Sequence, residues 1–285
     1  MNLRTLLTLG RISNLPTVWS NLLAGLIFAE AAGNLPVLAA TLAGGSFIYI
    51  GGMFLNDYCD VAYDAQYCPE RPIPAGLISR KAVGGFALLW FLLGLACLAP
   101  MGWTVAGIAL LLIAAVVAYN FHHKGVVWAP LLMGFCRFLL YPLAAITAPD
   151  RVSWTVLFSD AAALGLYVAG ITYLARGESR PGKPARWALL LLLAPLVLPS
   201  IVGMPSFLVL PWLAAASVPL AWMAWLLIPL WSKTKPSVGR VVAGLLAGIV
   251  LIDFLAVTPV LGWQAGWFLV LFLLALLLQR FVPAT

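Results

Sequence analysis

The sequence predicts an all-α fold, a polytopic transmembrane helical bundle around a central cavity. The composition is the first reason, because 64% of the 285 residues are hydrophobic and only 9% are charged. A soluble domain is nearer half apolar and a quarter charged. Apolar stretches of about 20 residues, the length that crosses a bilayer, also follow one another along the whole chain. These features exclude a soluble globular protein, a disordered chain and the usual nucleic-acid module, so we expect the lipid bilayer as a partner and no nucleic acid.

Ten apolar segments are predicted to form the helices, and short connections with Pro, Gly or charged residues separate them. No soluble domain fits between the segments, so residues 1–285 are predicted to be one transmembrane domain. The segments are 15–32, 36–58, 81–99, 103–121, 126–148, 154–176, 186–203, 206–231, 238–258 and 262–282.

Basic residues test this order of segments. Of the 16 Lys and Arg residues, 14 fall in the terminal stretches and the even-numbered connections. Arg151 lies in an odd-numbered connection, and Arg137 lies inside a segment. Because positive charge gathers on the cytoplasmic side, both termini are predicted to be cytoplasmic in a multi-pass protein of the cell inner membrane. If the last segment does not span, the C-terminus is outside.

The strongest chemical signal is the stretch Asn56-Asp57-Tyr58-Cys59-Asp60-Val61-Ala62-Tyr63-Asp64. If the second helix continues through it, Asn56, Asp60 and Asp64 share one face, with Asp57 beside them. Clustered carboxylates repel one another unless a cation neutralises them. Mg²⁺ is usually held by one or two carboxylates and substrate phosphates. The pattern therefore predicts Mg²⁺ and a diphosphate near these four residues, with catalysis by Asp57, Asp60 and Asp64; the alternative is a solvated helix end that pairs with Arg71.

The motif NDYCDVAYDAQYCPERPIPAG resembles the first Asp-rich motif of the UbiA family of intramembrane prenyltransferases, including the following Arg71-Pro72-Ile73-Pro74-Ala75-Gly76 element. The stretch from Arg11 to Thr17, with Asn21, resembles the family's first-helix pattern. Tyr119-Asn120 followed by Lys124 is similar to its fourth-helix end. The resemblance implies nine spanning helices, so the tenth predicted here is a departure.

The resemblance also implies an activity: an isoprenyl diphosphate donor binds with Mg²⁺, its allylic C–O bond ionises, and a small-molecule acceptor captures the allyl carbon. The active site then faces the cytoplasm, where Arg71 and Lys81 or Arg80 cover the diphosphate. Lys124 touches the diphosphate, and Tyr119, Asn120 and Tyr173 line the cavity. Asn21 either contacts the diphosphate or the acceptor, or forms a polar contact between helices. His122 and His123 are interpreted as interfacial residues, with phosphate contact as the alternative, and a metal pair is rejected.

The family's second Asp-rich motif, DxxxD, is altered here. Its region reads Tyr173-Leu174-Ala175-Arg176-Gly177-Glu178-Ser179-Arg180 and keeps one acid, Glu178. Either Glu178 still holds a second ion with waters, or Arg176 and Arg180, with Lys183, bind the diphosphate directly, as Arg does bidentately. The ARGE stretch and the MG-x-CR segment are similar to the EboC-like branch of the family. That match implies a small polyol ring as acceptor, whereas the wider family implies an aromatic one.

One charged residue is predicted deep in the membrane. Arg137 lies about 18 Å into the fifth segment at 1.5 Å per residue, and an unpaired charge there costs at least about 2.5–3.5 kcal/mol. Asp253 lies at similar depth in the ninth segment. We expect the two to interact, directly or through the acceptor. A purely structural ion pair is the alternative, and Asp160 is interpreted as structural.

Two other classes of function are compatible with acidic residues in a membrane. In a transporter the acidic cluster would be a coupling-ion site, but such sites lie near the midplane between inverted repeats, which this sequence does not show. CDP-alcohol phosphotransferases carry a longer DG-x-x-AR signature, which is absent. An inactive homologue that only binds prenyl diphosphate is the remaining alternative.

Overall fold

The computed structural model describes residues 3–123, 126–178, 187–201, 206–231 and 237–284, and these residues form helices without any strand. The prediction of an all-α bundle is therefore confirmed. The α-helices are α1 (Leu3–Leu9), α2 (Leu15–Phe28), α3 (Leu35–Tyr67), α4 (Arg80–Leu98), α5 (Trp103–His122), α6 (Ala129–Ala145), α7 (Trp154–Glu178), α8 (Ala188–Leu192), α9 (Ala194–Ile201), α10 (Ser206–Leu227), α11 (Val238–Ala247), α12 (Ile249–Leu261) and α13 (Trp267–Leu278). Short 3₁₀ turns join several of them: η1 (Ile12–Asn14), η2 (Ala99–Met101), η3 (Pro149–Arg151), η4 (Ile228–Trp231) and η5 (Gly262–Gly266).

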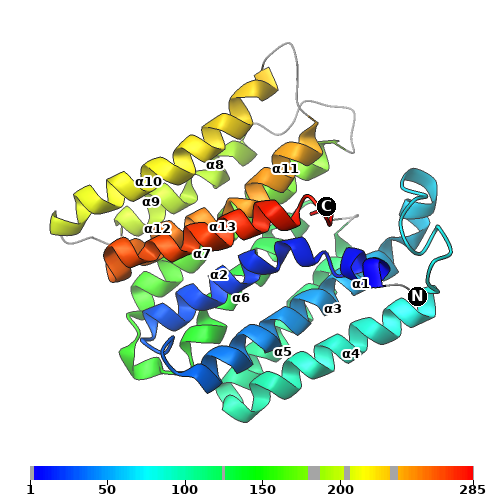
Figure 1. The fold of residues 1–285 in the computed structure, drawn as a ribbon, viewed down its shortest axis with the longest axis horizontal. Coiled ribbons are helices and arrows are strands. Elements are labelled where there is room, and N and C mark those ends of the chain that lie inside the picture. Colours follow the sequence, from blue (N-terminus) through cyan, green and yellow to red (C-terminus); the bar gives the residue numbers. More distant parts are fainter. Residues whose placement is uncertain (1–2, 124–125, 179–186, 202–205, 232–236, 285) are drawn as a thin grey trace.

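Helix ends follow local chemistry. The side chains of Asn34 and Ser79 accept hydrogen bonds from the backbone N–H groups of the third residue on, and so cap the starts of α3 and α4. Gly102 and Gly262 have φ of 129° and 57°, a conformation that glycine adopts without steric cost. At these glycines the chain reverses, so that α5 follows α4 and α13 follows α12 (Figure 1).

Six helical stretches in the described part of the chain are long and apolar enough to cross a membrane: Leu35–Tyr67, Arg80–Met101, Trp103–His122, Trp154–Arg176, Leu208–Leu230 and Val238–Leu278. Two shorter apolar stretches are Ile12–Phe28 and Ala129–Ala145. The last long stretch contains the turn at Gly262, so it comprises both the ninth and the tenth predicted segments.

Three predicted segments differ most from the observed helices. The ninth, 238–258, is divided at Gly248 into α11 and α12. The second was expected to end at residue 58, but α3 continues to Tyr67 and carries the whole acidic motif in helical form. The seventh, 186–203, is broken within its described part into α8 and α9, because the chain leaves helical hydrogen bonding at Leu193. The ten-segment count therefore remains a prediction, while the helical state of the acidic motif is observed.

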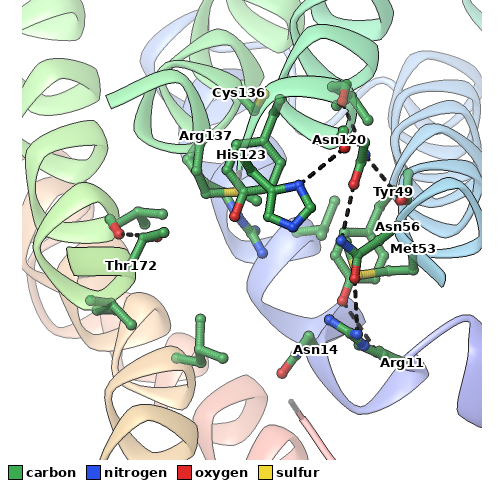
Figure 2. Close-up of a pocket in the computed structure, with 18 of the residues that line it drawn as sticks. Arg11, Asn14, Tyr49, Met53, Asn56, Asn120, His123, Cys136, Arg137 and Thr172 are labelled. Atoms are coloured by element: carbon green, nitrogen blue, oxygen red, sulfur yellow. Dashed lines mark hydrogen bonds between the residues drawn. The ribbon is translucent and has the colours of Figure 1, made fainter. Parts of the chain in front are cut away.

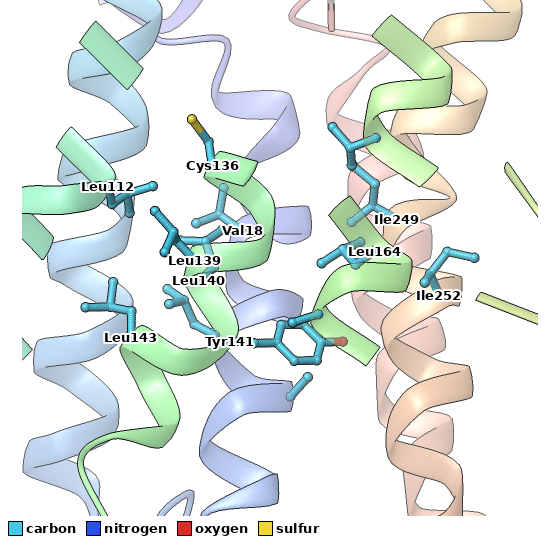
Figure 3. Packing of buried hydrophobic residues seen from close by; sticks show 14 of the residues in the cluster. Val18, Leu112, Cys136, Leu139, Leu140, Tyr141, Leu143, Leu164, Ile249 and Ile252 are labelled. Carbon is cyan, nitrogen blue, oxygen red and sulfur yellow. The ribbon is translucent and has the colours of Figure 1, made fainter. Parts of the chain in front are cut away.

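Helices α2 and α6 lie in the middle of the bundle and contact each other (Figure 1). Helix α3 packs on α4, α6 packs on α5 and α7, and α12 packs on α2 and α10. Leu139, Leu140 and Leu143 of α6 and Leu164 of α7 belong to the same buried core (Figure 3). The close approach of α6 and α7 requires Gly134, since a Cβ there would overlap the carbonyl oxygen of Gly165.

Candidate functional site

The last three turns of α3 carry an acidic cluster, which we define as Asn56, Asp57, Asp60 and Asp64. Asn56, Asp60 and Asp64 are four residues apart, so the helix places them on one face. The three aspartates are 6%, 8% and 2% exposed. Buried carboxylates at this density need compensating positive charge. The way the fold supplies that charge defines the site.

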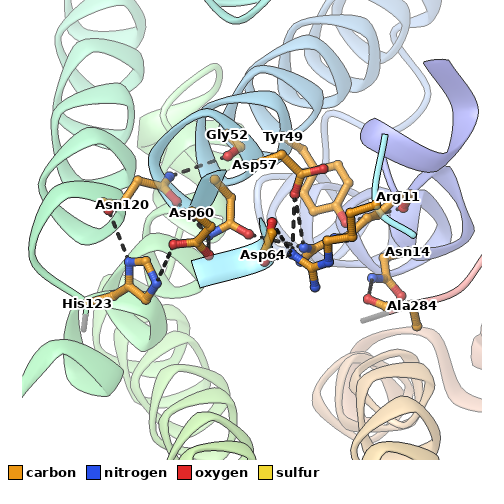
Figure 4. A network of polar contacts seen from close by, with 12 residues as sticks. Arg11, Asn14, Tyr49, Gly52, Asp57, Asp60, Asp64, Asn120, His123 and Ala284 are labelled. Atoms are coloured by element: carbon orange, nitrogen blue, oxygen red, sulfur yellow. Dashed lines mark hydrogen bonds and ion pairs between the residues drawn. The ribbon is translucent and has the colours of Figure 1, made fainter. Parts of the chain in front are cut away.

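Two arginines from outside α3 pair with the cluster (Figure 4). Arg71 Nη1 lies 3.2 Å and 3.1 Å from the two oxygens of Asp64 and 3.7 Å from Asp57 Oδ1. Arg11 Nη2 lies 3.3 Å from Asp57 Oδ1 and 3.1 Å from Asn56 Oδ1. Partial burial lowers the pKa of the Arg71 guanidinium, but the carboxylates of Asp64 and Asp57 outweigh burial and the pKa lies above its ordinary value. Arg71 is therefore a permanent cation at the site.

The third basic group comes from the end of α5. His123 Nε2 lies 3.3 Å from Asp60 Oδ1, and His123 Nδ1 lies 3.0 Å from the backbone oxygen of Asn120. Both ring nitrogens thus face oxygens, and the ring adds a positive charge beside Asp60 when it is protonated. Asn56 Nδ2 also donates to Asp60 Oδ2 and to Asn120 Oδ1, at 3.3 Å and 3.1 Å. Three carboxylates are therefore matched by two arginines and a histidine.

The acidic cluster opens into a cavity of about 350 Å³. Its polar end includes Arg11, Asn56, Asp60, Arg71 and His123 (Figure 2). Beyond them the wall is mainly apolar and is formed by Val18, Ile48, Leu112, Val116, Met133, Cys136, Leu140, Val168, Ile171 and Leu246, from α2, α3, α5, α6, α7 and α11. This arrangement suits a molecule with a charged head and an apolar tail.

A second polar group lies deeper in the same cavity. Arg137 Nη1 donates to Asn21 Oδ1 at 3.0 Å, and Asn21 Nδ2 donates to Asp253 Oδ2 at 2.7 Å. Tyr141 Oη donates to Asp253 Oδ1 at 2.8 Å. The expected interaction of Arg137 with Asp253 therefore exists, but the amide of Asn21 carries it in place of a direct ion pair or an acceptor.

The family model for UbiA prenyltransferases matches residues 15–239. The chain belongs to the UbiA prenyltransferase family. It is 30% identical to a digeranylgeranylglyceryl phosphate synthase of Methanopyrus kandleri over 150 residues, which are 51% of this chain and 52% of that protein. The digeranylgeranylglyceryl phosphate synthase of Sulfolobus acidocaldarius is 29% identical over 119 residues, which are 42% of this chain and 43% of that protein. A 4-hydroxybenzoate octaprenyltransferase of Photobacterium profundum is 35% identical over 81 residues, 27% and 28% of the two chains. The chain thus spans about half or less of the length of these curated relatives.

Two solved structures share the fold. A structure from work on digeranylgeranylglyceryl phosphate synthase in membranes has a TM-score of 0.64 at 16% identity and covers 90% of this chain and 98% of its own. The apo structure of a UbiA homologue from Aeropyrum pernix K1 has a TM-score of 0.52, also at 16% identity, and covers 96% and 95% of the two chains. The predicted membership of the UbiA family, and with it an integral membrane protein, is confirmed.

Six of the predicted site residues of this UbiA chain line the cavity: Asn56, Asp60, Arg71, Tyr119, Asn120 and Arg137. Asn120 lines it, and Tyr119 lines it while stacking on His123 with ring centroids 5.2 Å apart. Lys81 is exposed and does not belong to the described lining, and the Arg80 guanidinium lies over the Tyr58 ring at 4.4 Å. The cover expected from Arg80 or Lys81 is therefore not seen, because Arg80 is held by Tyr58 on the outer side of α3.

The altered second motif of the UbiA chain lies at the end of α7. Tyr173 packs edge-on against Trp187, with centroids 4.6 Å apart, and is not part of the described lining. Arg176 Nη1 donates to the backbone oxygen of Val126 at 2.8 Å. Lys124, Arg180 and the side chain of Glu178 lie outside the residues that the structure describes. The choice between a second ion and direct arginine binding therefore stays a prediction.

Sequence reasoning missed two functional candidates of this UbiA site. Arg11 was noted in the first-helix pattern but was not placed at the acidic cluster, because 46 residues separate it from Asp57. His123 was interpreted as interfacial, whereas the structure places it against Asp60. One signal was available: Asn120 and His123 are three residues apart and so share a helix face. His122 is exposed on another side, which supports the rejection of a histidine pair.

The acidic cluster also bears on the expected Mg²⁺. Within the described residues no group of three His, Cys, Asp or Glu converges as a metal site by itself. Mg²⁺ does not need one, because it is usually held by one or two carboxylates with substrate phosphates and waters. Asp60 and Asp64, one turn apart, offer the hard oxygen ligands that this ion prefers. The residues therefore fit a Mg²⁺ that is shared with a bound diphosphate.

Proposed function

We propose that this protein transfers an isoprenyl group from a prenyl diphosphate to a small acceptor within the membrane. The observation that carries the proposal is the juxtaposition of the acidic cluster and its cations with an apolar cavity. A prenyl diphosphate has the matching chemistry, with a polyanionic head and an apolar tail. The names of the curated relatives, which denote geranylgeranyl- and octaprenyl-transferring enzymes, agree with this donor class.

The head group would bind at the acidic cluster. Mg²⁺, when bound there with Asn56, Asp57, Asp60 and Asp64, would neutralise the diphosphate and stabilise the charge that develops on it as it leaves. Arg71 and Arg11 can exchange their carboxylate contacts for phosphate oxygens, which guanidinium groups bind bidentately. His123, beside Asp60, is a further candidate donor to the leaving group. Preorganised donors of this kind stabilise a leaving anion most strongly where water is excluded.

The two substrates account for every bond, electron pair and proton in the transfer step. The C–O bond between the allylic carbon and the diphosphate breaks, and its electron pair stays on the diphosphate. A lone pair of the acceptor forms the new bond to that carbon, and the proton of the acceptor passes to the released diphosphate. The apolar cavity wall keeps water from the cationic carbon, which would otherwise be hydrolysed.

The second motif would assist in binding the diphosphate. In this proposal Arg176 and Arg180 bind the diphosphate in place of a second metal ion, and Glu178 is the alternative ligand for such an ion. Lys124 and Tyr173 are further candidates for substrate contact. We also propose the orientation given by the basic residues, with the N-terminus and the active site toward the cytoplasm of a cell inner membrane.

The decisive test is diphosphate release by the purified protein from geranyl, farnesyl and geranylgeranyl diphosphate, with and without Mg²⁺. A pool of small cellular metabolites serves as the source of acceptor. We expect Mg²⁺-dependent release that Asp60→Ala abolishes and that Asp150→Ala, an exposed carboxylate in η3, leaves unchanged. Absence of release, with none of the three diphosphates stabilising the protein against heat, would refute the proposal. Stabilisation without release would instead indicate an inactive homologue that only binds the donor.

A further inference from the structure

The proposed diphosphate site does not use the deeper polar group of the cavity, which has the features of a second binding site. Arg137 lies eight residues into α6, about 12 Å from its start. It is 8% exposed and faces the cavity. A charged side chain at such depth normally pairs with protein groups or lines a functional cavity.

The guanidinium is only partly used by the protein. It has five N–H donors. In the part of the chain that the structure describes, its hydrogen bonds use one of them, Nη1 to Asn21 Oδ1. The ring of Tyr49 lies beside it, with 5.8 Å from the guanidinium carbon to the ring centroid. The remaining donors are free to bind a ligand in the cavity.

Asn21 and Asp253 fix the position and the charge of this group. A guanidinium only donates and a carboxylate only accepts, so the orientation of the Asn21 amide between them is dictated by chemistry. Asp253 is fully buried, and its two oxygens accept hydrogen bonds from Asn21 and from Tyr141. In its ionised form this carboxylate balances the charge of Arg137. An anionic ligand would therefore add a net negative charge to an apolar chamber, whereas a neutral oxygen would satisfy the donors without that cost.

Tyr49 connects this level to the diphosphate level. Its ring lies beside Arg137, and its hydroxyl group donates to the backbone oxygen of Arg11 at 3.3 Å. Arg11 in turn contacts Asp57. The two levels of the cavity are thus one tyrosine side chain apart, which places a ligand on Arg137 within reach of a carbon attached to the diphosphate.

We propose that Arg137 is the acceptor-binding residue and that it selects an uncharged, oxygen-bearing acceptor through hydroxyl or carbonyl oxygens. Asn21 and Asp253 are positioning residues that hold the guanidinium toward the cavity. This inference rests on the proposed prenyl transfer, because it assigns the second substrate of that reaction. It predicts a donor site and an acceptor site that separate mutations affect.

The first test is acceptor binding without the donor. We would measure thermal stabilisation of the purified full chain by 4-hydroxybenzyl alcohol and by inositol, and by their anionic counterparts 4-hydroxybenzoate and inositol phosphate. We expect a neutral member to stabilise wild type and Asp60→Ala but not Arg137→Met. Asp160→Asn is the matched control, since it changes a buried acid on α7 that does not belong to the described lining. Stabilisation that persists in Arg137→Met would overturn the placement of the acceptor.

The second test is transfer, with geranylgeranyl diphosphate as donor and the same four compounds as acceptors. We expect Arg137→Met to raise the acceptor KM at least about tenfold, the effect of losing a hydrogen bond to a charged group. The donor KM, and diphosphate release to water alone, should stay within about twofold. If wild type and Arg137→Met both fail to release diphosphate from the donor, the result counts against the proposed function and not against the role of Arg137.

A double variant tests the preference for neutral acceptors and guards against misfolding. Arg137→Gln with Asp253→Asn removes both charges but keeps a donor toward the cavity; the new amide oxygen can accept from Asn21, and its NH2 group can donate to the hydroxyl oxygen of Tyr141. We expect it to fold and to use the neutral acceptor better than Arg137→Met does. If wild type instead prefers the anionic member of each pair and the double variant loses it, the proposed acceptor class is wrong.

Discussion

Arg71 is the cation on which the acidic cluster most depends, so Arg71→Met is the sharpest perturbation of the site. Its guanidinium pairs with both oxygens of Asp64 and approaches Asp57. The variant leaves two carboxylates buried with fewer compensating charges. Removing one partner of a buried pair costs about 3–5 kcal/mol. Because the Arg71 side chain is 27% exposed, solvent screens part of this, and we expect a loss of about 2–3 kcal/mol in the free energy of unfolding.

The assay is thermal unfolding in detergent. At about 2–4 °C per kcal/mol for a chain of this size, the Tm of Arg71→Met should fall by about 4–12 °C. Arg80→Met is the matched control, since Arg80 directly follows the same loop, at the start of α4, but its guanidinium lies on the ring of Tyr58 outside the cluster. It should cost about 1 kcal/mol or less.

Mg²⁺ provides the discriminating arm of this experiment. A divalent cation can replace the charge that Arg71 supplied, so millimolar Mg²⁺ should raise the Tm of Arg71→Met more than that of wild type. Asp64→Asn added to Arg71→Met should recover stability by removing the orphaned charge. Equal Tm values for Arg71→Met and Arg80→Met, or no recovery in the double variant, would refute the charge balance described for the cluster.

Two further predictions follow from single contacts. His123→Ala should lower kcat/KM for the prenyl diphosphate about tenfold or more, because it removes a donor beside Asp60. His122→Ala should leave kcat/KM within about twofold. Equal effects of the two substitutions would show that the contact with Asp60 has no functional role. Gly134→Ala should lower the free energy of unfolding by about 1–3 kcal/mol, because the new Cβ would overlap the backbone of α7. Gly107→Ala should not destabilise the protein, since open space surrounds this glycine. An unchanged free energy of unfolding in Gly134→Ala would show that α6 and α7 can separate at little cost.

The sequence predicted what depends on local pattern. The apolar segments, the turns between them and the acidic face of α3 follow from composition and from the four-residue spacing of Asn56, Asp60 and Asp64. The length of α3 was underestimated, since a hydropathy pattern ends where the polar residues begin, near residue 58. The helix continues to Tyr67 because Arg11, Arg71 and His123 contact its polar end; Arg71 comes from the loop that follows, but Arg11 and His123 come from distant parts of the chain.

The sequence pattern could not predict tertiary contacts between distant residues. Arg137 and Asp253 were matched by depth, which is a one-dimensional argument, and depth gave the correct partners. It could not give Asn21 as the group between them, because 116 residues separate Asn21 from Arg137 and 232 separate it from Asp253. Likewise, a loop arginine is a candidate for a diphosphate by composition, and only the fold shows that Arg80 stacks on Tyr58 while Arg71 reaches the cluster.

The two polar levels of the cavity differ in how their charge is arranged, and the difference fits their proposed tasks. At the acidic cluster the arginines contact carboxylates directly, so a diphosphate with Mg²⁺ can exchange partners with them without leaving any charge unpaired. At Arg137 the amide of Asn21 stands between the guanidinium and the carboxyl group of Asp253, so the guanidinium is held in place yet keeps free donors toward the cavity. A purely structural ion pair would gain more from direct contact, because attraction between charges falls with distance. The inserted amide is therefore better explained by the need to present the guanidinium to a ligand.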